Sequence, residues 1–163
     1  MDYIQPRHKT LAFYGVPKTG SDTGDVTYTR MRKFTQLTKN KNPKEYTRQY
    51  VDEATEQTDV VGYAEQIDYG FDKHRNLAVQ KDMIQITDRE YVAENAVRTI
   101  IWVDTETGEA IKRDYSVIPG SEGDGTDIYK YSGSLKARGE AVFGTATSMD
   151  DWNTITFTEE DSD

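Results

Sequence analysis

The sequence has no cysteine, and it has only two histidines and two tryptophans among 163 residues. Without cysteine there can be no disulfide framework, no thiolate metal site and no thiol nucleophile. His8 and His74 do not stand at a metal-ligand spacing, so we expect neither to bind a metal nor to act in catalysis. These absences remove the commonest reactive groups, and we predict no metal and no cofactor.

Long apolar runs and catalytic motifs are missing as well. No segment approaches the length that spans a bilayer, and residues 1–7 lack the pattern of a signal peptide. There is no phosphate-binding loop and no nucleophile-elbow serine. The adjacent acids of 150–151 and 159–160 fall in a predicted turn and tail, where paired acid–base catalysis is unfavourable. We therefore predict a protein that is neither membrane-bound nor secreted, and not an enzyme.

Hydrophobic residues are scarce, at 35%, while charged residues make up 30% of the chain. Such a chain has either a small core or segments that become ordered only against neighbouring subunits. We favour the second explanation because twenty threonines and eleven tyrosines suit pleated, half-exposed surfaces and interfaces. At this length we expect one domain.

The net charge of −9 is unevenly distributed. Residues 1–50 contain ten lysines and arginines against four acids, whereas residues 51–163 contain ten against twenty-five. An acidic body repels polyanions, which argues against tight nucleic-acid binding. A basic front and an acidic back can instead meet between neighbouring copies, as in head-to-tail assembly.

The clearest secondary-structure pattern lies between Ile128 and Phe157. Apolar and polar residues alternate from Tyr129 to Arg138 and again from Thr154 to Thr158, with a reversal at 149–153 between them. A period of two places the apolar groups on one face of a strand, so this region predicts an antiparallel ribbon.

Further strands are predicted upstream of this ribbon. They cover 31–38, 45–52, 60–72, 97–103 and 109–118, with Gly108 supplying the positive φ of the last hairpin. Val79, Met83 and Ile86 share one face of a single helix, which we expect Asn76 to cap, with Gln80, Lys81 and Gln85 elsewhere on its surface. The fold class is thus mainly β, sandwich-like or barrel-like, with one short flanking helix.

Three regions are predicted to lie outside this framework. Residues 1–30 are interrupted by proline and glycine and are predicted to form an N-terminal arm, whose apolar cluster 11–16 packs on its own domain or on a neighbour. Residues 31–158 form the β domain, with a glycine-rich loop at 119–127 that lacks the ligand spacing of a calcium loop. Residues 159–163 form an acidic tail, which we expect to be disordered.

The chain resembles the major tail tube proteins of long-tailed bacteriophages and of prophages in Gram-positive hosts. The resemblance covers nearly the whole chain and depends on the order of its segments, since no single motif is diagnostic. The segments are 34–46 (FTQLTKNKNPKEY), 48–53 (RQYVDE), 58–63 (TDVVGY), 96–104 (AVRTIIWVD), 118–124 (IPGSEGD), 131–140 (YSGSLKARGE) and 144–147 (GTAT).

This resemblance implies a virion structural protein that self-assembles into stacked rings, each of six copies, which form the phage tail tube. Phage DNA would leave the capsid through the lumen without specific binding. The implied protein partners are further copies of the chain, the tape-measure protein, the tail terminator and the tail-tip or baseplate proteins. The implied location is the virion tail, assembled in the cytoplasm of the host bacterium.

Candidate contacts between subunits or rings come from the arm, the basic front and the acidic loops. They are Phe13, Tyr14, Arg32, Lys44, Arg48, Glu53, Glu56, Asp59, Glu122 and Asp124. One alternative is a related ring-forming protein, such as a baseplate hub or the inner tube of a secretion or contractile system. Another is a carbohydrate-binding tip module, whose aromatic residues would need to form an exposed platform. Trp102 and Trp152 are the only tryptophans available for it, and Trp102 is predicted to be buried.

Overall fold

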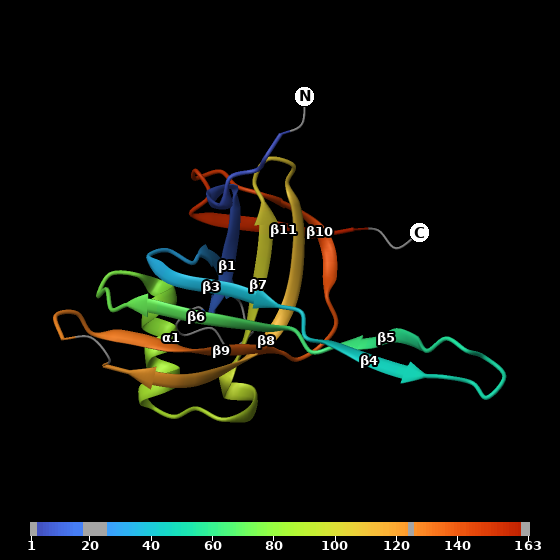
Figure 1. Cartoon of the computed structure of the whole chain (residues 1–163). Coiled ribbons are helices and arrows are strands. Elements are labelled where there is room, and N and C mark those ends of the chain that lie inside the picture. Colours follow the sequence, from blue (N-terminus) through green and yellow to red (C-terminus); the bar gives the residue numbers. More distant parts are fainter. Residues whose placement is uncertain (1–2, 18–25, 124–125, 161–163) are drawn as a thin grey trace.

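The computed structural model describes residues 3–17, 26–123 and 126–160. It contains eleven strands, one α-helix and two short 3-10 helices (Figure 1). The strands are β1 (Thr10–Pro17), β2 (Val26–Arg30), β3 (Phe34–Asn40), β4 (Pro43–Arg48), β5 (Gln57–Tyr63), β6 (Gln66–Asp72), β7 (Val97–Asp104), β8 (Glu109–Glu122), β9 (Lys130–Ala137), β10 (Val142–Thr147) and β11 (Thr154–Glu159). The helices are η1 (Arg7–Lys9), α1 (Ala78–Asp88) and η2 (Ala93–Ala96). The predicted mainly-β class with one short helix is confirmed.

Nine strands form one antiparallel sheet in the order β10-β11-β2-β1-β7-β8-β9-β6-β3. Because β10 also pairs with β8, the six strands from β10 to β8 close on themselves as a small barrel. Strands β9, β6 and β3 extend the sheet beyond β8. The chain passes from β9 to β10 along the same edge of β8, with a break at Gly139, where φ is 146°.

Two hydrophobic cores lie on opposite faces of the central strands. Phe13, Ile101 and Ile155 belong to the barrel core. Tyr14 and Ile100, one residue removed from the first two, belong to a larger core beneath α1 and the β9-β6-β3 extension. Alternation along β1 and β7 therefore supplies both cores from the same strands.

The helix confirms part of the sequence prediction and corrects part of it. Val79, Met83 and Ile86 are buried on one face, as their spacing predicts. Asn76 does not cap the helix, which begins at Ala78 without a side-chain cap. Gln80, predicted to be on the surface, is fully buried, and its side-chain oxygen accepts a hydrogen bond from the backbone N–H of His74. A buried amide with a backbone partner is satisfied, so burial costs little there.

Two strands of the predicted N-terminal arm, β1 and β2, belong to the main sheet. Strand β1 lies between β2 and β7 in the sheet, and Phe13 and Tyr14 are fully buried. The apolar cluster thus packs on its own domain, because an interior strand needs apolar side chains on both faces. Two smaller corrections concern β8, which continues to Glu122 through the predicted loop, and β11, which includes Glu159 of the predicted tail.

Candidate functional site

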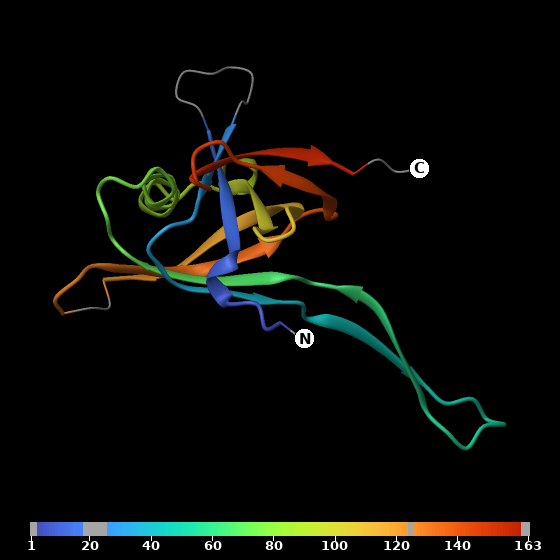
Figure 2. The same cartoon turned by 90° about the horizontal axis from the view of Figure 1, so that it is seen from above.

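A two-stranded hairpin, β4–β5, projects from the body of the molecule (Figures 1 and 2). Among the described strands, β4 and β5 pair only with each other. The predicted strand 60–72 is in fact divided here, with β5 in the hairpin and β6 in the main sheet. An isolated two-stranded hairpin is marginally stable in water at best, so this one needs further contacts to be firmly held.

The hairpin exposes apolar side chains along its whole length. Each of the following is at least half exposed: Tyr46, Tyr50, Val51, Val60, Val61 and Tyr63. No residue of β4 or β5 is buried. Apolar side chains gathered on one projecting element indicate an interaction surface, whereas single exposed ones are ordinary.

One face of the hairpin combines cations with aromatic rings. Lys44, Tyr46 and Arg48 alternate along β4 and so share a face. The guanidinium carbon of Arg48 lies 5.5 Å from the ring centre of Tyr46 and 5.8 Å from that of Tyr50. The guanidinium also pairs with Asp59 at 2.5 Å and donates to the Tyr50 hydroxyl, and these bonds raise the pKa of Arg48. We call Lys44, Tyr46, Arg48 and Tyr50 the cation–aromatic face.

The root of the hairpin is fixed by Glu65, which lies between β5 and β6 and is 5% exposed. Its carboxylate accepts a hydrogen bond from the Tyr115 hydroxyl at 2.8 Å and pairs with Arg113. Lys39 and Lys41 each approach it to 3.6 Å. Burial alone would raise the pKa of Glu65, but the Tyr115 bond and the three cations hold it below its usual value.

The carboxylate of Glu65 therefore connects the hairpin to the body. Burial lowers the pKa of Lys39 although Glu65 opposes the shift. Burial and the bond to Glu65 both raise the pKa of Tyr115. A buried carboxylate with several partners is strongly destabilised when a partner is lost, so the root is more rigid than the exposed strands beyond it.

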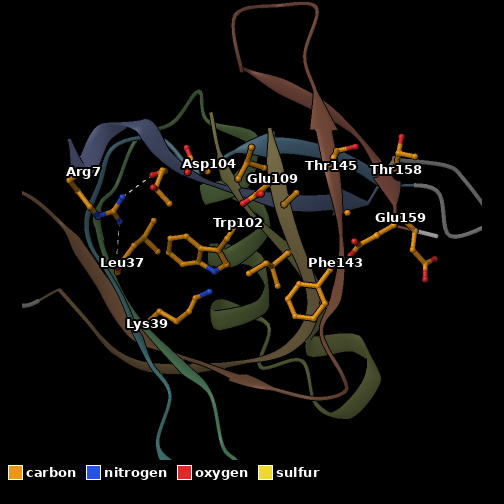
Figure 3. A pocket seen from close by; sticks show the side chains of 16 residues that line it. Arg7, Leu37, Lys39, Trp102, Asp104, Glu109, Phe143, Thr145, Thr158 and Glu159 are labelled. Carbon is orange, nitrogen blue, oxygen red and sulfur yellow. Dashed lines mark hydrogen bonds between the residues drawn. The ribbon is translucent and has the colours of Figure 1, made fainter. Parts of the chain in front are cut away.

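A groove of about 880 Å³ lies on the body near this root (Figure 3). Leu37, Trp102 and Phe143 contribute its apolar surface, and Phe143 is half exposed. The Lys39 ammonium lies 5.0 Å from the centre of the Trp102 ring. Four carboxylates also line the groove: Asp104, Glu109, Glu159 and Glu160.

The structure gathers five of the ten predicted contact residues on the hairpin or its tip. These five are Lys44, Arg48, Glu53, Glu56 and Asp59. Arg32 is exposed in the turn between β2 and β3, and Glu122 is exposed at the end of β8. Asp124 lies outside the described residues.

Phe13 and Tyr14 require a correction. Both side chains are fully buried in the body, so neither is available as a surface contact of the folded chain. Phe13 packs in the barrel core, and the Tyr14 hydroxyl donates to Asp82 of α1 at 2.5 Å. Their apolar character serves the fold because the strand that carries them is interior.

Sequence reasoning missed Glu65 and the groove. No local signal marked Glu65, which lies between two strands beside Gln66, while Lys39 and Lys41 are more than twenty residues away in the sequence. The groove had no local signal, since its residues come from strands that are far apart in the sequence.

Neither a metal centre nor a membrane helix is found in the described part of the chain. No group of three or more histidines or acids there is arranged to hold a metal ion. No described helix has the length and apolar character needed to cross a bilayer. The four groove carboxylates form no such group.

Comparisons with known proteins gave a likeness to solved structures but none to a protein family. No protein-family model matches the chain, and no curated protein matches it. Among solved structures, a chain from the cryo-EM structure of the anti-feeding prophage baseplate, symmetrised six-fold, superposes with a TM-score of 0.46 and 7% identity. The match covers 88% of this chain and 97% of that one. At this level of similarity the likeness carries no argument about function.

Proposed function

We propose that this protein is a structural subunit of a phage tail or of a related tail-like assembly, and that it works by binding other copies of itself. The observation that carries the proposal is the β4–β5 hairpin, whose valines and tyrosines are each at least half exposed and none of whose strand residues is buried. Apolar surface gains free energy only when it is removed from water. A second copy of the chain would supply that burial.

The charge distribution supports the same proposal. The basic first third and the acidic remainder of the chain are complementary between copies. An acidic surface also suits a conduit for DNA, because cations facing phosphates would add salt-dependent affinity and drag. Ring closure would protect the edge strand β3 and the edges of the hairpin, which otherwise template aggregation.

The finer form of the proposal is the tail tube itself. In it, six copies form a ring, rings stack into a tube, and DNA passes through the lumen without specific binding. Tape-measure, terminator and tail-tip or baseplate proteins would bind the ends or the interior, and the tube would belong to the virion tail after assembly in the host cytoplasm. The protein would have no enzymatic activity. A baseplate hub or the inner tube of a contractile system is the alternative within the same class.

The test is negative-stain electron microscopy of the full chain over a range of concentrations, with and without tail-tip extract. We expect rings or hollow tubes, and we expect Tyr46→Ser combined with Val60→Ser to abolish them while the thermal unfolding curve stays unchanged. Lys81→Ser, on the exposed side of α1, is the matched control. Monomers under every condition, with no incorporation into tails, would overturn the proposal.

A further inference from the structure

The cations and the carboxylates that line the groove differ in whether they already have a partner of opposite charge or another polar partner. Its two cations already have partners, since Lys39 pairs with Glu65 and Arg7 donates to the backbone oxygens of Thr10 and Leu37. Of its four carboxylates, Asp104 accepts a hydrogen bond from the backbone N–H of Glu106, but no ion pair joins any of the four to a cation of the described residues. The groove therefore carries uncompensated negative charge, which would attract a cation.

The carboxylates are placed by the strands that close the barrel. Glu109 pairs in register with Thr145 across β8 and β10, and Glu159 pairs with Gly144 across β10 and β11. Both acids thus flank the same short stretch of β10, and Asp104 lies across the tight turn from Glu109. In Figure 3, Asp104 and Glu109 lie on the upper side of the groove, away from Lys39, and Glu159 lies at the right, on the side of Phe143.

The apolar part of the groove lies beside these acids. Phe143 exposes 55% of its surface, and Trp102 forms the floor with 9% exposed. A side chain with a long apolar stem and a cationic head would cover Phe143 and reach a carboxylate together. An aromatic ring next to such a cation would add further burial. The groove is thus matched to a segment in which cations alternate with aromatic residues.

We propose that the groove receives the cation–aromatic face of the β4–β5 hairpin from a second copy of this chain. Lys44 and Arg48 flank Tyr46 on that face, and no ion pair joins Lys44 to any acid of the described chain. The acids Asp52, Glu53 and Glu56 lie at the hairpin tip, beyond the paired residues of β4 and β5. Within the paired strands, Glu45 lies on the opposite face of β4 and Asp59 is paired with Arg48, so the uncompensated charge on this face is that of Lys44, at the root of the hairpin. Its root half is the part that complements an acidic rim.

The hairpin of the same chain does not fill this groove. It leaves the body at Pro43 and projects outward, as Figures 1 and 2 show from two directions. The donor face and the acceptor groove are different surfaces of one molecule, so their contact is heterologous and leaves a free donor at one end of a pair and a free acceptor at the other. Repetition of the contact gives a ring or a filament. This inference rests on the proposed self-assembly and specifies its contact.

Cross-linking tests the contact directly, because the chain has no native cysteine. Lys44→Cys and Glu109→Cys are prepared separately and mixed under mild oxidation. We expect a disulfide-linked dimer in the mixture, on the order of tenfold more than with Lys44→Cys mixed with Lys81→Cys. Both substituted positions of the test pair are exposed, and circular dichroism verifies that each variant is folded.

Charge reversal provides a second readout. We expect Lys44→Glu alone and Glu109→Lys alone each to weaken assembly, on the order of tenfold in the concentration required, and we expect the doubly reversed chain to recover it. If rings or tubes form but neither the cross-link nor the recovery is seen, the hairpin docks elsewhere or the groove binds a different partner, and this inference is overturned while the proposed function stands. If the parent chain never assembles and no pair cross-links, both are overturned.

Discussion

The body of the molecule and the hairpin that projects from it treat apolar side chains in opposite ways. In the body, Phe13, Ile101 and Leu135 are completely buried, whereas in the hairpin Val51 and Val61 are open to solvent. The body therefore accounts for its own stability through burial. The apolar residues of the hairpin bury little surface in the single chain and so stabilise it little. Their burial against another molecule would instead favour association. Stability and assembly are consequently separable by mutation.

The largest expected effect comes from emptying the body core. Phe13→Ala removes a fully buried ring from the barrel core and should lower the free energy of unfolding by about 3–5 kcal/mol. Val51→Ala, at the hairpin tip, should change it by less than about 0.5 kcal/mol. Urea unfolding followed by tryptophan fluorescence measures both. A small loss of stability for Phe13→Ala together with loss of assembly would restore Phe13 as a contact residue.

The next effect concerns the root of the hairpin, where Glu65 connects it to the body. Glu65→Gln leaves Lys39, Lys41 and Arg113 without their shared counter-charge and should cost about 2–3 kcal/mol. The substitution should also increase the rate of hydrogen exchange more in residues 43–63 than in the barrel strands. Glu56→Gln, which makes the same substitution at an exposed acid of the hairpin tip, is the matched control. Equal exchange in both variants would mean that Glu65 does not hold the root.

Acidification should weaken the contacts of Glu65 at the root of the hairpin. Because the pKa of Glu65 is lower in the folded chain than in the unfolded one, its contribution is fully present above about pH 4.3, the unfolded value, and is lost as the pH falls through the folded pKa. Protection of residues 43–63, measured against the intrinsic exchange rate at each pH, should therefore fall below about pH 4 in the parent. The Glu65→Gln variant should show no such step, and a step of equal size in that variant would assign the effect to other acids.

The smallest effect is local to the body. Asp150 accepts hydrogen bonds from the backbone N–H and the hydroxyl of Thr154, at 3.0 and 2.7 Å, and from Ser148. The Thr154 bonds lead in lowering the pKa of Asp150 to about 2. Its support of the β10–β11 turn is present above the unfolded value of about 3.9 and is lost as the pH falls through about 2. An NMR titration of the carboxyl group checks this, and a midpoint near 4 would contradict it.

Local patterns predicted the elements whose partners are close in sequence. The structure confirms the buried helix face of Val79, Met83 and Ile86, and it confirms the hairpin that turns at Gly108. Each of these features depends on a period or a turn that a short segment contains. The burial of Trp102 is confirmed for the same reason, since its strand is continuously apolar.

Long-range pairing was not predictable from those patterns. Residues 10–17 are interrupted by glycine and proline like an arm, yet β1 pairs with β7, which lies more than eighty residues later. Closure of the barrel through β10 and β8 depends on a break at Gly139 whose effect on direction is not encoded by alternation. The Glu65 joint likewise depends on cations from β3 and β8 that only the finished fold brings together.

Strand β8 has a consequence for how the chain folds. Its first half closes the barrel against β10, its second half pairs with β9, and its side chains enter both cores, with Ala110 in one and Tyr115 and Val117 in the other. Neither core can be completed while this strand is unpaired. We therefore expect the two halves of the body to melt in one cooperative transition, and to fold slowly because the strands that meet at β8 are distant along the chain.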